Sequence, residues 1–95
     1  MIQPGKVIGF PSLATTVVCG MHHTVVLLSS GEVFSFGANT MGQLGVGDLS
    51  TRFQPARVVL PEKVTQVAAG NFHTLFLTEQ HNVYASGNHE VSGPM

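Results

Sequence analysis

The stretch that decides the fold is residues 11–37, PSLATTVVCGMHHTVVLLSSGEVFSFG, because residues 61–87, PEKVTQVAAGNFHTLFLTEQHNVYASG, repeat it fifty positions later. Nine positions are identical in this register without a gap, including Gly20 with Gly70 and the His-Thr pair that follows each glycine three residues on. Compositional bias does not hold glycine and His-Thr in one register. We therefore interpret the two stretches as copies of one structural unit.

Each copy is predicted to form β-strands and no helix. Short apolar or β-branched runs are separated by turns rich in glycine, serine and asparagine. The runs cover residues 15–19, 23–28 and 33–36 in the first copy and residues 64–68, 73–78 and 83–86 in the second. Short continuous runs bounded by turn residues are typical of fully buried strands in stacked sheets.

A fourth strand is predicted between the copies. The glycine-rich loop 37–48 is followed by residues 53–60, which contain Pro55. Proline lacks the N–H of a ladder hydrogen bond, so this run suits the edge of a sheet. About four strands in a repeat of this length is the pattern of a propeller blade.

The sequence therefore predicts an all-β fold of four-stranded antiparallel propeller blades that do not complete a ring. Residues 1–10 are interpreted as a lead-in or as the outer strand of a preceding blade. Residues 11–60 are expected to form the first blade and residues 61–95 a truncated second blade.

Charge is scarce in this chain. Charged residues make up 9% of the sequence, against about 25% in ordinary domains, while the hydrophobic fraction is 43% and the formal net charge is -1. We therefore expect other protein to cover part of the surface. The four basic residues are scattered, which disfavours binding to nucleic acid or to an anionic membrane.

Targeting signals are weak. No run approaches the roughly 20 apolar residues of a membrane-spanning helix. The partly apolar run before Cys19 is interrupted by Pro11 and makes a poor secretory signal. Cys19 is the single cysteine, so no intrachain disulfide forms, which fits a reducing compartment.

We expect no catalytic, metal-binding or cofactor-binding residue in this sequence. Zinc-type ligands are present without compact spacing; they are His22, His23, His73, His81, His89 and Cys19. The carboxylates are isolated, so none forms an acid–base pair; they are Glu32, Asp48, Glu62, Glu79 and Glu90. The glycines of residues 37–42 fit a phosphate loop, but Gln43-Leu44 stand where lysine and then serine or threonine are required.

Structural roles are predicted for the same motifs. A catalytic residue would not recur in each copy, so His23 and His73, each paired with the threonine that follows it, are expected to donate hydrogen bonds to backbone carbonyls and to tie adjacent strands or blades together. Gly20 is expected at a sharp turn or a close approach of two backbones. Asn39 and Gln43 are expected to satisfy loop backbone groups. Cys19, whose counterpart is an alanine, is expected to be a small buried hydrophobe.

The quoted motifs resemble the repeat of the regulator of chromosome condensation family. They are VCGMHHT at 18–24, GEVFSFGAN at 31–39 and GQLGVGD at 42–48, with AAGNFHT at 68–74 and VYASG at 83–87 in the second copy. The match covers residues 13–87. Phe36 and Ser86 stand where the family usually has tryptophan, and the second copy does not reach a Gly-Gln-Leu-Gly loop.

The resemblance implies a seven-bladed propeller, of which this chain would hold fewer than two blades. It also implies a protein-interaction or scaffold segment that catalyses nothing itself, binds protein partners through rim loops and works in the cytoplasm or nucleus. Two alternatives remain open: part of a guanine-nucleotide exchange factor for a small GTPase, or part of a multidomain ubiquitin ligase. The missing basic patch counts against attachment to DNA. Exposed sheet edges predict that the isolated chain self-associates.

Overall fold

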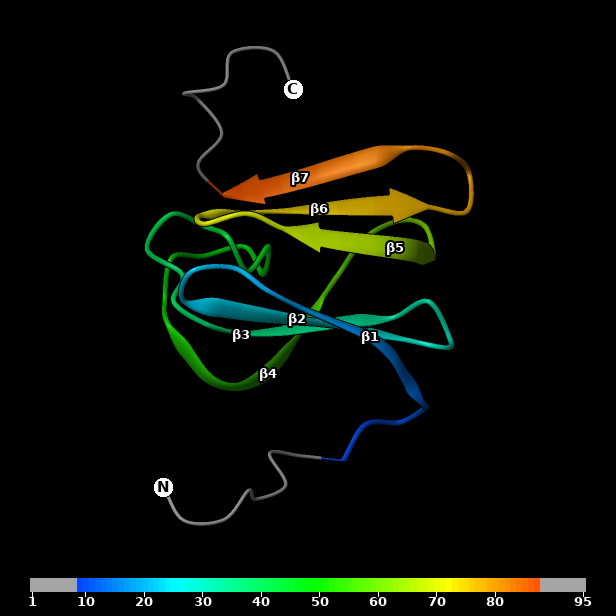
Figure 1. The fold of residues 1–95 in the computed structure, drawn as a ribbon, viewed down its shortest axis with the longest axis horizontal. Helices are drawn as coiled ribbons and strands as arrows, with labels where there is room; N and C mark the ends of the chain where they lie inside the picture. The colour runs from blue at the N-terminus through cyan, green and yellow to red at the C-terminus, as the bar shows by residue number, and fades with distance from the viewer. Residues whose placement is uncertain (1–8, 88–95) are drawn as a thin grey trace.

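A computed structural model describes residues 9–87, which form two antiparallel sheets stacked face to face (Figure 1). The strands are β1 Ala14–Cys19, β2 His23–Leu28, β3 Val33–Gly37, β4 Arg52–Val58, β5 Val64–Ala69, β6 His73–Thr78 and β7 Val83–Gly87. The first sheet, here called blade 1, has the order β1-β2-β3-β4, and the second, blade 2, has the order β5-β6-β7. Within residues 9–87 no helix is long and apolar enough to cross a membrane.

The two copies have the same strand register. β1 pairs with β2 as β5 pairs with β6, and a register shift falls between Ala14 and Thr16 in blade 1 and between Val64 and Gln66 in blade 2. The β2–β3 and β6–β7 hairpins also align residue for residue after a shift of fifty positions. The six strands predicted in the repeats are confirmed, with ends that differ by no more than one residue.

The strand predicted between the copies is confirmed as β4, which forms the outer edge of blade 1 beside β3. Pro55 lies within it, as a proline at a sheet edge should. Blade 1 therefore has the four strands expected of a propeller blade, and blade 2 has three within the described residues.

The largest cluster of buried hydrophobic side chains lies between the blades, while Val26, Leu28 and Leu44 are buried outside it. Side chains alternate across a strand, so one face of β2 presents Val25 and Leu27 to blade 2, while β6 presents Phe76 to blade 1. All three are at least 96% buried. Val33, Val58 and Val64 complete this cluster.

The prediction of fully buried strands is wrong for the edge strands β1, β5 and β7. In β1 every residue is exposed except the partly buried Val18, β5 has one buried residue, Val64, and β7 has none. The expectation that Cys19 is buried is wrong for the same reason. Cys19 ends the edge strand β1 and is exposed, and its Sγ lies 3.9 Å from Thr24 Oγ1.

The domain division stays a prediction. Most of the lead-in assigned to residues 1–10 lies outside the described residues, as does the part of the second copy after Gly87.

Candidate functional site

The strands run between two rims of the blade pair, at opposite sides of Figure 1. The loop rim carries the turn 20–22, the long loop 38–51 and the turn 70–72. The turn rim carries the turn 29–32, the connection 59–63 and the turn 79–82. The seam between the blades joins the rims, so its contacts determine how the loops of each rim are held.

A chain of buried hydrogen bonds closes the seam near the loop rim. Thr74 Oγ1 donates to the Gln43 carbonyl oxygen at 2.7 Å, and Ser86 Oγ donates to the same oxygen at 3.0 Å. His23 Nε2 lies 2.9 Å from Thr74 Oγ1. Because the single hydroxyl hydrogen of Thr74 is used on the carbonyl, His23 Nε2 is the donor, and the ring is the neutral Nε2–H tautomer.

His23 belongs to blade 1 and Thr74 to blade 2, so the predicted tie between blades is confirmed. The threonine donates to a backbone carbonyl as predicted, whereas His23 donates to the threonine hydroxyl instead of to a carbonyl. His23 is 3% exposed, and burial lowers the pKa of its imidazole. Its Nδ1 is also buried and has no hydrogen-bond partner among the described residues, so protonation there would place an unpaired charge in the seam.

The repeated glycine before each histidine is required by close packing. A Cβ on Gly20 would overlap the ring of His23 and the Gly70 carbonyl oxygen of the neighbouring blade. A Cβ on Gly70 would overlap the ring of His73 in the same way. The prediction of a close backbone approach at Gly20 is confirmed.

The loop 38–51 is held by two buried amide side chains, as predicted. Asn39 Nδ2 donates to the carbonyl oxygens of Asp48 and Ser50, and Asn39 Oδ1 accepts from the Leu44 amide. Gln43 Oε1 accepts from the Met41 amide at 2.9 Å. These contacts occupy amides that a phosphate loop would leave free for its ligand, so the loop is a structural one.

The candidate metal ligands are not brought together. Residues 9–87 contain no group of three His, Cys, Asp or Glu side chains arranged to hold a metal ion. His23 and His73 belong to different blades, Cys19 is on an exposed edge, and His89 lies outside the described residues.

Two carboxylates are held by hydrogen bonds of their own. The Ser50 amide and the Arg52 guanidinium lower the pKa of Asp48, and Arg52 lies 2.7 Å from it. Glu62 accepts from Thr78, Asn82 and Tyr84, which lowers the pKa of its carboxyl. Tyr84 has a raised pKa because burial and the Glu62 carboxylate both disfavour the phenolate.

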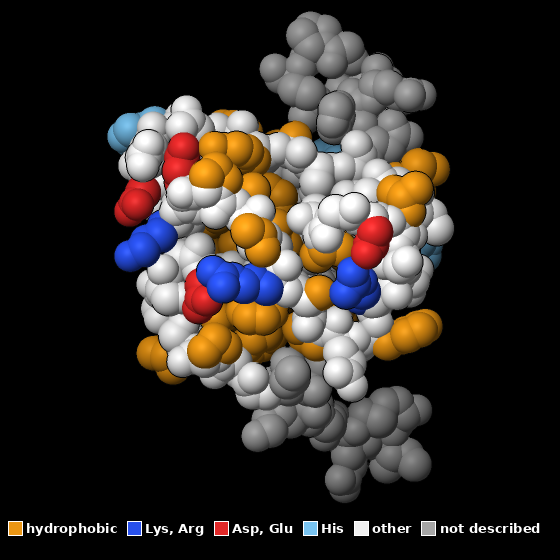
Figure 2. Space-filling model, turned by 180° about the vertical axis from the view of Figure 1, so that it is seen from behind, with side chains coloured by type: hydrophobic (Ala, Val, Ile, Leu, Met, Phe, Trp, Pro, Cys, Tyr) orange, Lys and Arg blue, Asp and Glu red, His pale blue; other side chains and the backbone are white. Residues whose placement is uncertain are grey.

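The two rims differ in chemistry. The loop rim and the adjoining start of β4 expose four large apolar side chains, which are Met21, Met41, Leu49 and Phe53. Phe53 is 89% exposed. The Asp48–Arg52 pair on this rim is neutral overall. The turn rim exposes three large apolar side chains, Leu13, Val59 and Val83, and also carries most of the charge. Its charged side chains gather toward the left of Figure 2, which views the molecule from behind.

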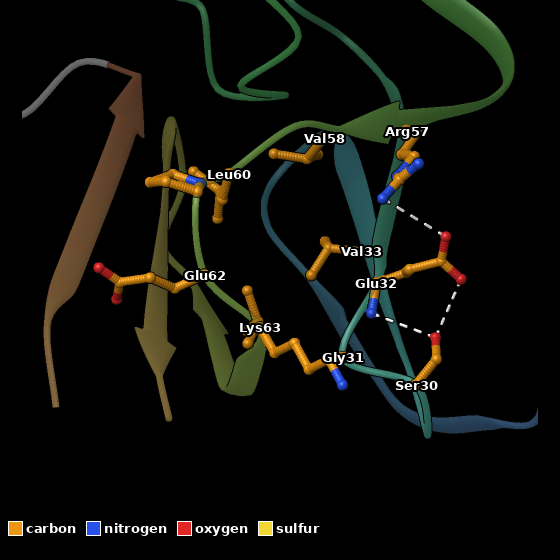
Figure 3. Close-up of a pocket in the computed structure, with 11 residues that line it drawn as sticks. Ser30, Gly31, Glu32, Val33, Arg57, Val58, Leu60, Glu62 and Lys63 are labelled. Atoms are coloured by element: carbon orange, nitrogen blue, oxygen red, sulfur yellow. Dashed lines mark hydrogen bonds and ion pairs between the residues drawn. The ribbon is translucent and has the colours of Figure 1, made fainter. Parts of the chain in front are cut away.

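A small pocket opens in the seam at the turn rim (Figure 3). Its volume is about 200 Å³, and it lies between the turn 29–32 of blade 1 and the connection 59–63 that leads into blade 2. The connection is fixed by a hydrogen bond from the Val64 amide to the Gly31 carbonyl oxygen at 3.1 Å. This pocket was not predicted from the sequence, because Glu32 belongs to a predicted turn, Arg57 to a predicted strand, and Glu62 and Lys63 to the segment before the next strand.

Comparison with known proteins agrees with this geometry. A family model described as "Regulator of chromosome condensation (RCC1) repeat" matches residues 30–77. A second model of the same description matches residues 14–43 and 64–92, which are the two copies.

Relatives and solved structures carry the same repeat. The chain is 45% identical over 76 residues to the E3 ubiquitin-protein ligase MYCBP2 of Danio rerio, covering 79% of this chain and 2% of that protein. It is 44% identical over 71 residues to the regulator of chromosome condensation of Xenopus laevis, covering 73% of this chain and 17% of that protein. The crystal structure of Prp20p from Saccharomyces cerevisiae superimposes with a TM-score of 0.70 at 29% identity, covering 81% of this chain and 19% of that one.

The chain thus spans less than a fifth of the length of each of these proteins. Its described residues form two neighbouring blades of a β-propeller that do not close a ring. One family model matches half of the sequence and the other matches both copies, so the chain belongs to the regulator of chromosome condensation (RCC1) repeat family.

Proposed function

We propose that this chain is a protein-interaction segment of an RCC1-type propeller, with no catalysis of its own, working in the nucleus or cytoplasm. One observation carries the proposal. The buried polar side chains are used to close the seam and to shape the loop 38–51, while large apolar side chains remain exposed on the loop rim. Exposed apolar groups on loops held by a rigid scaffold are typical of partner-binding surfaces.

The loop rim has the properties of a protein-binding surface. Met41 and Leu49 are both exposed on this rim, and Leu49 Cδ2 is 3.6 Å from the position a Cβ on Gly42 would take. Methionine side chains adapt to different partners because they are flexible and polarizable. The neutral Asp48–Arg52 pair gives this rim no electrostatic preference for nucleic acid.

Site-specific photo-crosslinking in cells tests the proposal. A photoreactive amino acid placed at Met41 or Phe53 is expected to form adducts of discrete mass with other proteins. The same group at Val17, an exposed apolar position in β1 between the two rims, is the matched control. Adducts that are the same at all three positions, or none at Met41 and Phe53, would refute protein binding through this rim.

Guanine-nucleotide exchange is a second candidate, favoured by the likeness to Prp20p, whose structure is reported with its binding properties to Gsp1p and histones. Exchange works through a protein–protein contact, so it is a special case of the first proposal. The test is the release of a fluorescent guanine nucleotide from a panel of purified small GTPases. Acceleration that Met41→Ser abolishes supports exchange, and unchanged release across the panel removes it.

A role within a ubiquitin ligase is a third candidate, favoured by the likeness to MYCBP2. In that case the blades would recruit the substrate, and ubiquitin transfer would belong to other parts of the protein. Substitutions on the loop rim would then abolish ubiquitination of a bound substrate without changing the ligase's autoubiquitination. A parallel loss of both activities would contradict a recruiting role.

A further inference from the structure

The pocket in the seam at the turn rim is too small for a cofactor and well sized for one side chain. Its volume of about 200 Å³ is below the roughly 300–1,000 Å³ of small-molecule sites. Val33, Val58 and Leu60 point toward it from the two sides of the seam (Figure 3), and of these three only Leu60 remains partly exposed. Its polar edge therefore decides which side chain it accepts.

Both carboxylates at this edge already have partners. Glu32 Oε1 accepts from Ser30 Oγ at 2.9 Å, and Glu32 Oε2 lies 3.5 Å from Arg57 Nη2. Glu62 is held by the hydroxyl and amide groups of Thr78, Asn82 and Tyr84. Figure 3 shows both carboxylates directed away from the centre of the pocket.

The groups that remain free at the edge are hydrogen-bond donors. Lys63 forms no ion pair with another residue of the described part of the chain, and its stem packs against Gly31, where a Cβ would lie 2.8 Å from Lys63 Cβ. Arg57 has a side chain 58% exposed and uses one long contact to Glu32, so most of its N–H groups are available. The pocket thus places an apolar floor between two cationic donors.

We propose that this pocket binds the side chain of a glutamate presented by a protein partner. The methylenes would lie on the partly exposed side chain of Leu60, and the carboxylate would accept hydrogen bonds from Lys63 and Arg57. The inference rests on the proposed protein-interaction function and adds a specific contact on the rim opposite to Met41 and Phe53.

The charge of the rim selects a single carboxylate over a polyanion. Three carboxylates, Glu32, Glu62 and Glu79, stand on this rim against the two cations, which gives a formal charge of -1. Glu79 lines the neighbouring hollow on the other side of Lys63 and is not within ion-pair distance of it. A phosphate or a nucleic acid would meet this net negative charge, whereas one carboxylate needs only the two local donors.

Nuclear magnetic resonance titration of the whole 95-residue chain tests the inference. The probe is the capped tripeptide acetyl-Ala-Glu-Ala-amide, with Gln, Asp and phosphoserine analogues and a peptide whose carboxylate is only at its C-terminus. The glutamate peptide is expected to shift the amide signals of Gly31, Glu32 and Val64 with a dissociation constant in the millimolar range, because exposed ion pairs are weak. The other peptides are expected to bind at least threefold more weakly.

Variants identify the donors. Lys63→Gln is expected to weaken glutamate-peptide binding about threefold, and the double variant Lys63→Gln/Arg57→Gln about tenfold. Lys63→Arg, which keeps the donor, is expected to retain binding. The matched control is Arg52→Gln on the loop rim, which should leave binding unchanged, and spectral dispersion shows that each variant is folded.

Equal binding of the glutamine peptide, tighter binding of the phosphoserine peptide, or unchanged affinity in the folded double variant would each overturn the inference. Its failure is distinguishable from failure of the proposed function. Partner adducts at Met41 together with no glutamate-peptide binding would leave the proposed function intact. Peptide binding together with no partner adducts would support the glutamate pocket and refute protein binding through the loop rim.

Discussion

Replacing Thr74 by valine removes the hydroxyl that joins the two blades while nearly keeping the shape of the side chain. In the structure this hydroxyl accepts from His23 Nε2 at 2.9 Å and donates to the Gln43 carbonyl at 2.7 Å. After the change, the carbonyl keeps the hydrogen bond from Ser86, but the buried N–H of His23 has no acceptor.

The magnitude follows from this difference. A buried polar group left unsatisfied costs about 1–3 kcal/mol, and the lost bond to the carbonyl adds about 0.5 kcal/mol because Ser86 remains. We expect Thr74→Val to lower the free energy of unfolding by about 1.5–3.5 kcal/mol. For a chain of this size the melting temperature should fall by roughly 6–28 °C.

Thr24→Val is the matched control, since Thr24 is the counterpart of Thr74 in blade 1. It faces away from the seam, and its Oγ1 has only the weak contact to Cys19 Sγ at 3.9 Å. We expect a change within about 0.5 kcal/mol. Urea denaturation followed by circular dichroism measures both variants, with trimethylamine N-oxide added to all samples if Thr74→Val is unfolded in buffer. Equal losses in the two variants would refute the role assigned to the seam.

Three further predictions concern the same seam. Burial lowers the pKa of His23 from its ordinary 6.5, so the unfolded chain takes up the proton first, and the free energy of unfolding should fall as the pH drops from about 6.5 through the folded-state pKa. Urea denaturation midpoints between pH 8 and pH 5 measure this pH dependence. An equal pH dependence in His23→Gln would contradict the prediction. Phe76→Ala leaves a cavity in the core between the blades and should lower the free energy of unfolding by about 3–5 kcal/mol. Phe53→Ala, at a side chain 89% exposed, should change it by less than about 0.5 kcal/mol. Thermal melts in which Phe53→Ala is the less stable variant would argue against this core. Gly20→Ala places a Cβ on the His23 ring and should cost at least about 1–3 kcal/mol, while Gly9→Ala, where a Cβ meets nothing within 4 Å, should be neutral in the same melts.

The repeat in the sequence predicted the strands because two copies in one register constrain each other. Glycine and His-Thr stand at the same place in both copies, so turns and strand starts could be assigned twice. Pro55 placed β4 at an edge for a local reason, namely its missing N–H. These features depend on neighbours along the chain and are therefore visible without a structure.

What the sequence did not predict depends on neighbours across the sheet or across the seam. The apolar run that contains Val17 looked buried, but β1 is an edge strand and Val17 is 58% exposed. Cys19 was misjudged for the same reason. The contact between Thr74 and the Gln43 carbonyl could not be predicted, because a residue of one copy meets a loop of the other only after the blades stack. The pocket at Lys63 likewise exists only between the blades.

The packing of one blade on the other is tested most directly by nuclear Overhauser effects between the two copies. If the blades stack as described, cross-peaks are expected between the His23 ring and the Thr74 methyl group, and between Gly31 Hα and the Lys63 side chain. A well-dispersed spectrum with sequential and intra-blade cross-peaks but none linking residues 14–37 with residues 61–87 would contradict this stacking.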